Sequence, residues 1–424
     1  MKKIVLCLGM ILMLVLILPT TSSSIPAFAR KYGFNCNMCH TAFTKLNDWG
    51  QRYRDNGYQI PGQEGTEKNV FDIAPPLSLR TSTGLSIYNA KNDSVSGTTT
   101  GFGLYGLDFL AAGVFHKNVS FLLIYTPRID EPGADFSGPG PQGSNPAQLA
   151  TLESANLVFS NLVQDALNLR IGRYEPAYHL VSSKRNFYIF EPYEIYTFST
   201  PNNTFVFDDN QIGIEATGHF QSGFKYGLGV VNGNGANPDI KTGKDVYATV
   251  SQTIQKGEGQ SAGQRIGAFG YLGWQPLTVP GDIVSPTGET NGTDSKAFYR
   301  IGANGSFNYE MFNLNLFFMS GSDDEALNTL QAGENYNFTG GFAQLDWAGL
   351  LNNRVIASVM YNWVRPPSYD SGRQIDAYSA LVRYYLGDWS AVNVALHAEY
   401  TFKRTGKDNP IDEHLVTMIL DFDF

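Results

Sequence analysis

Charged residues are few in this sequence, and basic residues are fewer than acidic ones. Only 16% of the 424 residues are Asp, Glu, Lys or Arg, against roughly 25% in an ordinary soluble domain. The 39 acidic and 30 basic residues give a formal net charge of −9. Nucleic-acid binding depends on clustered Lys and Arg that contact phosphates, so this composition argues against a nucleic-acid partner.

Long apolar runs are absent except at the start of the chain. Two lysines precede an apolar stretch at residues 4–18, and the small-residue sequence Ala27-Phe28-Ala29 follows. This order predicts a secretory signal peptide over residues 1–29, with cleavage after Ser24 or Ala29. No later segment reaches the length of about eighteen apolar residues that a spanning helix needs. The protein is therefore predicted to be exported, and any membrane insertion would have to use β-strands.

Cysteine is scarce, and two of the three cysteines form a motif. Cys7 lies in the signal segment, which leaves Cys36-Asn37-Met38-Cys39-His40. This C-x-x-C-H sequence is the attachment signal for a c-type haem. Two thiols at this spacing can bind the two vinyl groups of one haem, and His40 is then expected to bind the iron as the proximal ligand. A thioredoxin-like redox pair would need a βαβ context that is not found here, but a Cys36–Cys39 disulfide stays open as the alternative.

Residues 30–75 differ in pattern from the rest of the chain. Apolar residues recur at helical spacing and predict a helix over residues 41–56, namely Phe43, Leu46, Trp49 and Tyr53. Gly57 is expected to end this helix, and residues 62–69 form a polar linker.

From about residue 76 the apolar pattern changes to a period of two. One face of each segment is apolar and aromatic and the other is polar, which is typical of a membrane β-barrel. Sixteen such segments are predicted, near residues 77–88, 101–113, 117–127, 151–161, 166–175, 210–220, 224–232, 244–254, 264–274, 296–309, 312–320, 337–347, 353–363, 375–386, 390–402 and 413–424. A soluble sandwich or propeller is the alternative, but the low charge and the lack of a propeller repeat argue against it.

The predicted connections alternate between long and short. The long ones are 89–100, 128–150, 176–209, 233–243, 275–295, 321–336, 364–374 and 403–412. Long extracellular loops and short periplasmic turns are typical of bacterial outer-membrane barrels. An even number of strands then places residues 30–75 and Phe424 on the periplasmic side. The longest loop, 176–209, corresponds to the one that often folds inward in general porins.

The segment from Pro26 to Tyr58 carries a local family resemblance. Residues 26–30 (PAFAR), the C-x-x-C-H sequence, Leu46 and Asn56-Gly57-Tyr58 resemble the outer-membrane cytochrome–porin fusions. These are mono-haem c-type cytochromes joined to a sixteen-stranded porin, best known as extracellular iron(II) oxidases. The resemblance implies one haem c, an extracellular electron donor such as iron(II) and a periplasmic c-type cytochrome as partner. Electron flow in the reverse direction, to an external acceptor, is equally compatible with it.

A sixth ligand for the haem iron is not evident within residues 30–75. Met38 lies between the two cysteines and cannot reach the distal face, and this segment holds no second His. We therefore expect a distal ligand from the barrel, either His219 or His397. The alternation of side chains along their strands predicts that both face the lumen. Weaker candidates by position are His116, His179, His414 and Met360.

Several charged residues have an ordinary and a functional interpretation. Five arginines face the lumen by parity and would line a pore that favours anions, or would hold haem propionates: Arg80, Arg170, Arg265, Arg300 and Arg383. Acidic residues at 208–209 and 323–325 lie in predicted loops. They are expected to be solvated, the alternative being that they gather iron(II).

Together these patterns predict an all-β protein of the bacterial outer membrane. It is a sixteen-stranded antiparallel transmembrane β-barrel (76–424) with a small N-terminal α-helical c-type haem module (30–75), after a signal peptide (1–29). The barrel contacts lipid, and the module lies on the periplasmic side or in the lumen. The expected function is electron transfer across the membrane by an oxidoreductase. The alternatives are a passive diffusion porin with an N-terminal plug held by a Cys36–Cys39 disulfide, and a haem site with an open sixth position that binds ligands or peroxide.

Overall fold

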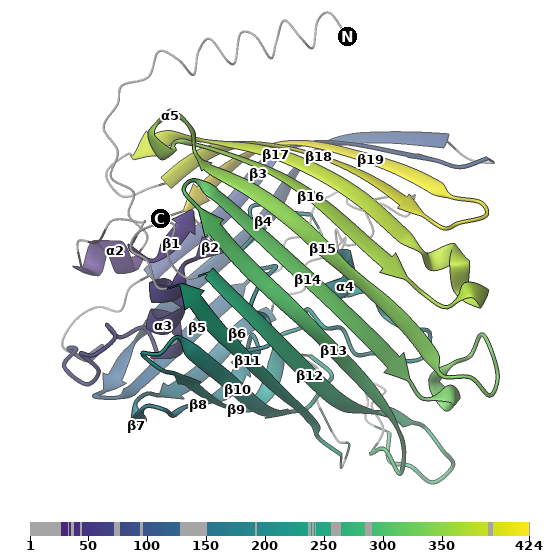
Figure 1. The fold of residues 1–424 in the computed structure, drawn as a ribbon, viewed down its shortest axis with the longest axis horizontal. Helices are drawn as coiled ribbons and strands as arrows, with labels where there is room; N and C mark the ends of the chain where they lie inside the picture. Colours follow the sequence, from purple (N-terminus) through teal and green to yellow (C-terminus); the bar gives the residue numbers. More distant parts are fainter. Residues whose placement is uncertain are drawn as a thin grey trace, which may run out of the picture.

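The chain forms a closed antiparallel barrel of sixteen strands in the computed structural model, seen in Figure 1. The structure describes residues 27–32, 34, 38–42, 45–71, 77–93, 96–127, 151–190, 193–235, 239, 241, 243–255, 264–284, 291–388 and 393–423. None of the helices within these ranges is long and apolar enough to cross a membrane.

The barrel strands follow the chain in order around the wall, and each pairs with its sequence neighbours. They are β3 (Leu77–Lys91), β4 (Ser96–His116), β5 (Val119–Thr126), β6 (Thr151–Phe159), β8 (Asn168–Tyr174), β9 (Gln211–His219), β10 (Phe224–Val231), β11 (Asp245–Gln255), β12 (Gln264–Leu277), β13 (Asp294–Tyr309), β14 (Phe312–Asp323), β15 (Tyr336–Gly349), β16 (Val355–Arg365), β17 (Ile375–Asp388), β18 (Asn393–Thr405) and β19 (Ile411–Asp423). The barrel closes where β19 pairs with β3. The prediction of a sixteen-stranded antiparallel barrel is confirmed.

Two connections differ from the prediction. The loop predicted at 89–100 is instead mostly strand, because β3 and β4 stay in register as far as Lys91 and Ser96. The β-branched Thr98, Thr99 and Thr100 suit this extended pairing. Between β6 and β8 the short strand β7 (Leu162–Asp165) adds a small hairpin that is not part of the barrel wall. Short helical turns occur at η3 (Glu325–Leu327), α5 (Leu350–Asn353) and η4 (Ser368–Arg373).

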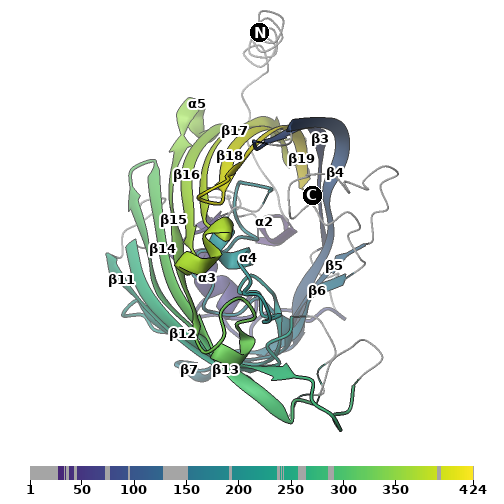
Figure 2. The ribbon, with the colours of Figure 1, turned by 90° about the vertical axis from the view of Figure 1, so that its right-hand side faces the viewer.

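A large aromatic core fills part of the lumen. The connection 175–210 folds inward and carries the short helix α4 (Glu194–Thr197), which lies within the ring of strands in Figure 2. Its buried side chains include Tyr178, Tyr193, Tyr196 and Phe207. They pack on inner-wall residues of β10 to β17, as where Tyr193 stacks on Phe342 with ring centroids 3.7 Å apart. The inward folding expected for this loop is confirmed.

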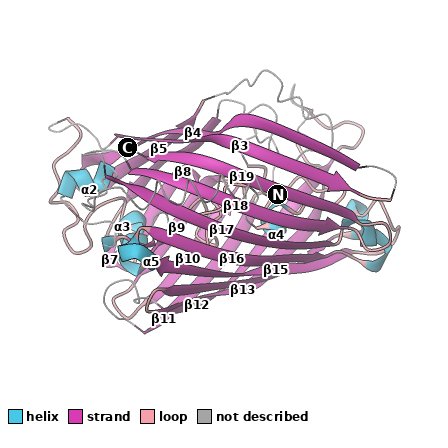
Figure 3. Cartoon of the chain, turned by 90° about the horizontal axis from the view of Figure 1, so that it is seen from above, coloured by secondary structure: helices cyan, strands magenta, loops and turns pink. Residues whose placement is uncertain are grey.

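The N-terminal module occupies the end of the barrel where the short turns lie (Figures 1 and 3). It contains α2 (Ala27–Tyr32), the paired short strands β1 (His40–Ala42) and β2 (Lys45–Leu46), and α3 (Asp48–Asp55). The helix predicted over 41–56 is therefore wrong in its first half. The physical reason is Asn47, whose side chain accepts a hydrogen bond from the Gly50 N–H and caps a helix that begins one residue later.

Candidate functional site

The described part of the C-x-x-C-H segment is held against the start of α3. Cys36 and Asn37 lie outside the described residues, whereas Met38, Cys39 and His40 lie within them. The Asn47 backbone N–H donates to the Cys39 carbonyl at 2.9 Å, and the Asn47 side-chain amide donates to the Met38 carbonyl at 3.1 Å. A Cβ at position 50 would overlap the Cys39 carbonyl oxygen. Gly50 therefore lets the helix approach the motif more closely than any other residue would.

Aromatic side chains surround this segment. Tyr53 on α3 stacks on Trp49 with centroids 5.5 Å apart, and Phe28 on α2 stacks on Tyr58 at 5.0 Å. Phe28 also meets the edge of Tyr53 at 5.3 Å. Gly57 and Tyr58 both have positive φ, which turns the chain after α3, as expected for Gly57 as the end of the helix.

A cavity of about 280 Å³ separates the module from the inner wall of the barrel. Its module side includes Cys39, His40, Leu46, Trp49 and Tyr53. Its barrel side includes apolar residues of three neighbouring strands, namely Leu110 and Ala112 on β4, Leu122 and Ile124 on β5, and Val158 on β6. Cys39 and His40 thus face an apolar surface inside the lumen.

This apolar inner wall departs from the pattern of a water-filled barrel, in which the lumen face is polar. Leu123 and Leu157, next to Leu122 and Val158 in sequence, are more than one-third exposed on the outer face. The strand β5 is therefore apolar on both faces beside the cavity, whereas β6 contributes Ser154 and Asn156 as well as Val158 to the lining. The sequence carried a signal for this in the run Leu122-Leu123-Ile124. A run of consecutive apolar residues is compatible with a strand. Because it does not alternate with polar residues, it does not indicate which side chains face the lumen.

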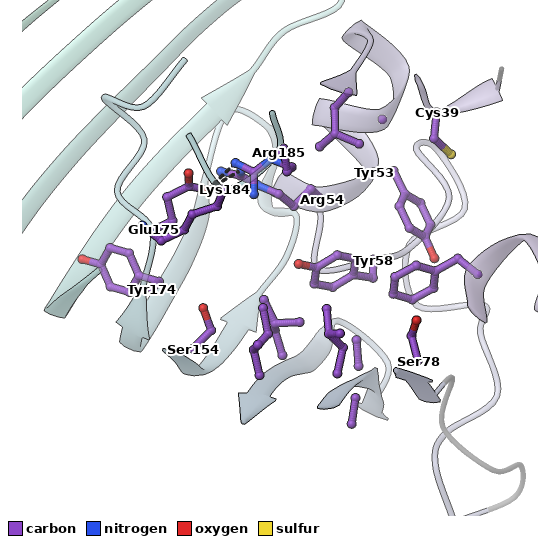
Figure 4. Close-up of a pocket in the computed structure, with 18 of the residues that line it drawn as sticks. Cys39, Tyr53, Arg54, Tyr58, Ser78, Ser154, Tyr174, Glu175, Lys184 and Arg185 are labelled. Atoms are coloured by element: carbon purple, nitrogen blue, oxygen red, sulfur yellow. Dashed lines mark hydrogen bonds and ion pairs between the residues drawn. The ribbon is translucent and has the colours of Figure 1, made fainter. Parts of the chain in front are cut away.

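The far end of the cavity is charged. In Figure 4, Arg54, Glu175, Lys184 and Arg185 lie together, away from Cys39, with Tyr53 and Tyr58 between them. Glu175 accepts hydrogen bonds from Arg54 at 3.2 Å, from Ser182 at 2.5 Å, and from Arg185. Burial alone would raise the pKa of Glu175, but the guanidinium groups of Arg185 and Arg54 hold it well below its usual value.

Buried ion pairs join the module to the barrel. Asp55 is 2.5 Å from the Lys225 ammonium on β10, and Lys45 pairs with Asp346 on β15. Burial acts to raise the pKa of Asp55, but the Lys225 charge and a hydrogen bond to His219 lower it well below its usual value. Asp48 lies 3.6 Å from His219, and despite burial this contact lowers the pKa of Asp48 to about 2.

The two predicted distal ligands lie elsewhere. His219 on β9 has its ring nitrogens 3.6 Å and 3.7 Å from the carboxylates of Asp48 and Asp55. His397 on β18 lies 3.1 Å from Glu399 and 3.5 Å from Asp421. Neither side chain lines the cavity, and the structure does not bring either of them together with His40. In both cases carboxylates lie next to the ring, on α3 for His219 and on β18 and β19 for His397, which the strand alternation alone does not reveal.

The remaining candidates are also outside the cavity. The buried His179 ring makes a 2.7 Å hydrogen bond to the Phe207 carbonyl, and burial lowers its pKa to about 4. Every His and Met after residue 26 belongs to the described part of the chain. Of these, His40 alone lines the cavity.

Four of the five arginines predicted to face the lumen form ion pairs there. These pairs are Arg80–Asp108, Arg170–Glu215, Arg300–Asp323 and Arg383–Asp421. Asp323 is fully buried by its arginine, so the expectation of a solvated acidic loop is wrong at this residue. Within the described ranges, no group of three or more His, Cys, Asp or Glu side chains is arranged to hold a metal ion. Sequence reasoning missed Arg54 and Arg185, because their positions depend on how α3 and the loop 175–210 fold.

Comparisons with known proteins support the barrel. Neither the protein-family models nor the curated proteins give a match. Among solved structures, an anion-selective porin from Comamonas acidovorans aligns with a TM-score of 0.53 at 12% identity, covering 82% of this chain and 100% of the porin. OprB of Pseudomonas putida aligns at 0.52 and 11%, covering 84% and 95%, and the outer membrane channel DcaP of Acinetobacter baumannii at 0.50 and 8%, covering 82% and 97%.

These similarities are structural, because the identities are very low. The three alignments cover 82–84% of this chain, and they bear on the fold alone. What they establish is that the chain has the fold of a porin-type sixteen-stranded barrel.

Proposed function

We propose that this protein carries electrons across the bacterial outer membrane by means of one haem c held inside the barrel. Cys36 and Cys39 would attach the cofactor covalently, and His40 would bind its iron. The observation that carries the proposal is the cavity between the C-x-x-C-H segment and the apolar inner wall formed by Leu110, Leu122 and Ile124. When bound there, the haem supplies a one-electron couple whose potential depends on its axial ligands and its burial.

The surrounding residues fit such a group. A tetrapyrrole is largely apolar, and burying it against Leu122 and Ile124 removes apolar surface from water. Asn47 and Gly50 fix the motif against α3, which orients His40 toward the cavity wall.

The alternative of a passive diffusion porin draws support from the porin-type fold. Against it, residues 175–210 pack a continuous aromatic core onto the inner wall of β10 to β17. At the end with the short turns, the module adds buried ion pairs to the barrel, including Asp55–Lys225. Both features narrow any water-filled path, so we favour a barrel that holds a cofactor over one that serves mainly as a channel.

Location and orientation follow from the same proposal. Short turns are periplasmic in bacterial outer-membrane barrels, which would place the module on the periplasmic side of the lumen. Oxidation of one external iron(II) to iron(III) would release one electron, and a periplasmic c-type cytochrome would collect it.

Because Phe28 packs between Tyr53 and Tyr58, we propose cleavage after Ser24, which keeps Phe28 in the mature chain. Mass spectrometry of the mature N-terminus tests this choice.

The functional test is an absorbance spectrum of the purified protein before and after iron(II) is added, together with conductance in a planar bilayer. We expect a c-type spectrum that becomes reduced by iron(II), and a conductance well below that of an open porin. A c-type spectrum that only dithionite reduces would reject iron(II) as the donor. A protein without haem and with a large steady conductance would instead establish the diffusion porin.

A further inference from the structure

Two guanidinium groups share one carboxylate at the charged end of the cavity. Arg54 on α3 and Arg185 in the loop 175–210 both bind the same oxygen, Oε2, of Glu175. Their side chains are largely buried, and both line the cavity. Lys184 also lines it, but its ammonium donates to the Asp208 carbonyl at 2.6 Å and so is engaged away from Glu175.

The wider ion-pair network carries an excess of positive charge. Its cations are Arg54, Arg170, Arg185 and Lys225, and the carboxylates paired with them among the described residues are Asp55, Glu175 and Glu215. Four cations therefore meet three anions among these pairs, and Glu153, which lies near Lys184 and Arg80, adds a carboxyl group to the lining of the same cavity. Arg54 and Arg185 are the two cations of this network that share a single carboxylate oxygen.

We propose that Arg54 and Arg185 form a carboxylate-binding site that takes the propionate groups of the haem. This inference rests on the proposed function and adds a second point of attachment to it. Arginine suits the role because its planar fork binds carboxylates bidentately. The covalent attachment at Cys39 and this site lie at separate ends of the cavity, as Figure 4 shows for Cys39 and Arg185. The cofactor would thereby connect the module to the lumen loop.

The test uses the full-length protein carrying haem whose propionate carboxyl carbons are labelled with ¹³C. Redox-difference infrared spectra report the labelled carboxylate bands without interference from Glu175. We expect Arg54→Gln and Arg185→Gln each to shift these bands, and Arg185→Lys to restore them in part because it keeps the charge but loses the fork. Arg80→Gln is the matched control, since Arg80 lines the same cavity but pairs with Asp108 at 2.5 Å. This control should leave the labelled bands in place.

The outcomes separate this inference from the function on which it rests. Wild-type protein without covalent haem would overturn both. If the haem is covalently bound but its labelled bands do not shift in Arg54→Gln and Arg185→Gln, or shift only in Arg80→Gln, the proposed carboxylate-binding site is wrong. The proposed electron-transfer function would still stand. If Arg185→Gln fails to fold, Arg185→Lys decides, because unchanged bands in that variant contradict a bidentate contact.

Discussion

The inner wall of the barrel differs between two groups of strands at the same end. On β13 to β15 the inner face near the module is polar and hydrogen-bonded, with Asn308, Asn313, Gln344 and Asp346 buried. On β4 and β5 the face that lines the cavity is apolar, with Leu122 as a central member. The first wall receives the module through the Lys45–Asp346 pair, whereas at the second wall a cavity lies between Leu122 and the segment that holds Cys39 and His40. An apolar lumen face is useful only if something apolar occupies the space beside it.

The largest expected effect comes from removing the attachment chemistry. Replacing both thiols (Cys36→Ser with Cys39→Ser) should abolish covalent haem completely, because no other cysteine remains after signal cleavage. Haem staining on a denaturing gel measures this loss. The barrel should still insert and resist heat like wild type, since its strands do not depend on the thiols. Failure to insert would mean that the module is needed for folding of the barrel.

The polar wall is tested through its buried ion pair. Lys45→Met removes the partner of Asp346, whose side chain is 1% exposed. Removing one member of a buried pair typically costs about 3–5 kcal/mol, because the other charge is left uncompensated. We expect residues 27–71 to become sensitive to protease in the single variant, and less so when Lys45→Met is combined with Asp346→Asn. Equal sensitivity of the single and double variants would show that this pair does not anchor the module.

The apolar wall offers a matched pair of neighbouring residues. Leu122 lines the cavity, and Leu123 points to the outside with 39% of its surface exposed. If the proposed haem occupies the cavity, Leu122→Asn would bring a polar group and water to it, so the midpoint potential should fall as the oxidised form is favoured. Leu123→Asn should leave the potential unchanged and affect only insertion. Equal potentials in both variants would remove the distinction between the two faces.

A smaller effect is expected from acid. Asp48 has a pKa of about 2 in the folded protein, below its usual value of 3.8. A carboxylate with a lowered folded-state pKa stabilises the folded state above its unfolded pKa, and loses this contribution as pH falls through the folded value. Docking of the module should therefore be constant above about pH 4 and weaken toward pH 2. Hydrogen exchange of residues 48–55 measures this, and Asp48→Asn should flatten the dependence. A wild-type loss of protection already near pH 5 would contradict it.

Much of the barrel could be predicted because alternation is a local property of each strand. The segment predicted at 312–320 becomes β14 at Phe312–Asp323, a difference of three residues at one end. The loop predicted at 89–100 is wrong because pairing between β3 and β4 carries the strands beyond the apolar pattern. The helix predicted from residue 41 begins at Asp48, since Asn47 caps it. An Asn-Asp pair before an aromatic run was the signal available for that boundary.

The candidate site was less accessible to sequence reasoning. Cys39 and His40 are recognisable because their spacing is local. The cavity beside them depends on three strands distant in sequence, and the Arg54–Glu175–Arg185 cluster depends on how a loop folds into the lumen. The alternation of side chains along each strand predicted that His219 and His397 face the lumen. It could not show that carboxylates already lie next to both rings.

The most direct test of the account is the mass of the tryptic peptide that contains Cys36, Cys39 and His40, from protein matured with the cell's haem-attachment system. We expect this peptide to carry one haem through two thioether bonds. A peptide with a Cys36–Cys39 disulfide and no haem would contradict it. In that case the apolar wall of β4 and β5 would need another occupant, and the protein would be a plugged porin.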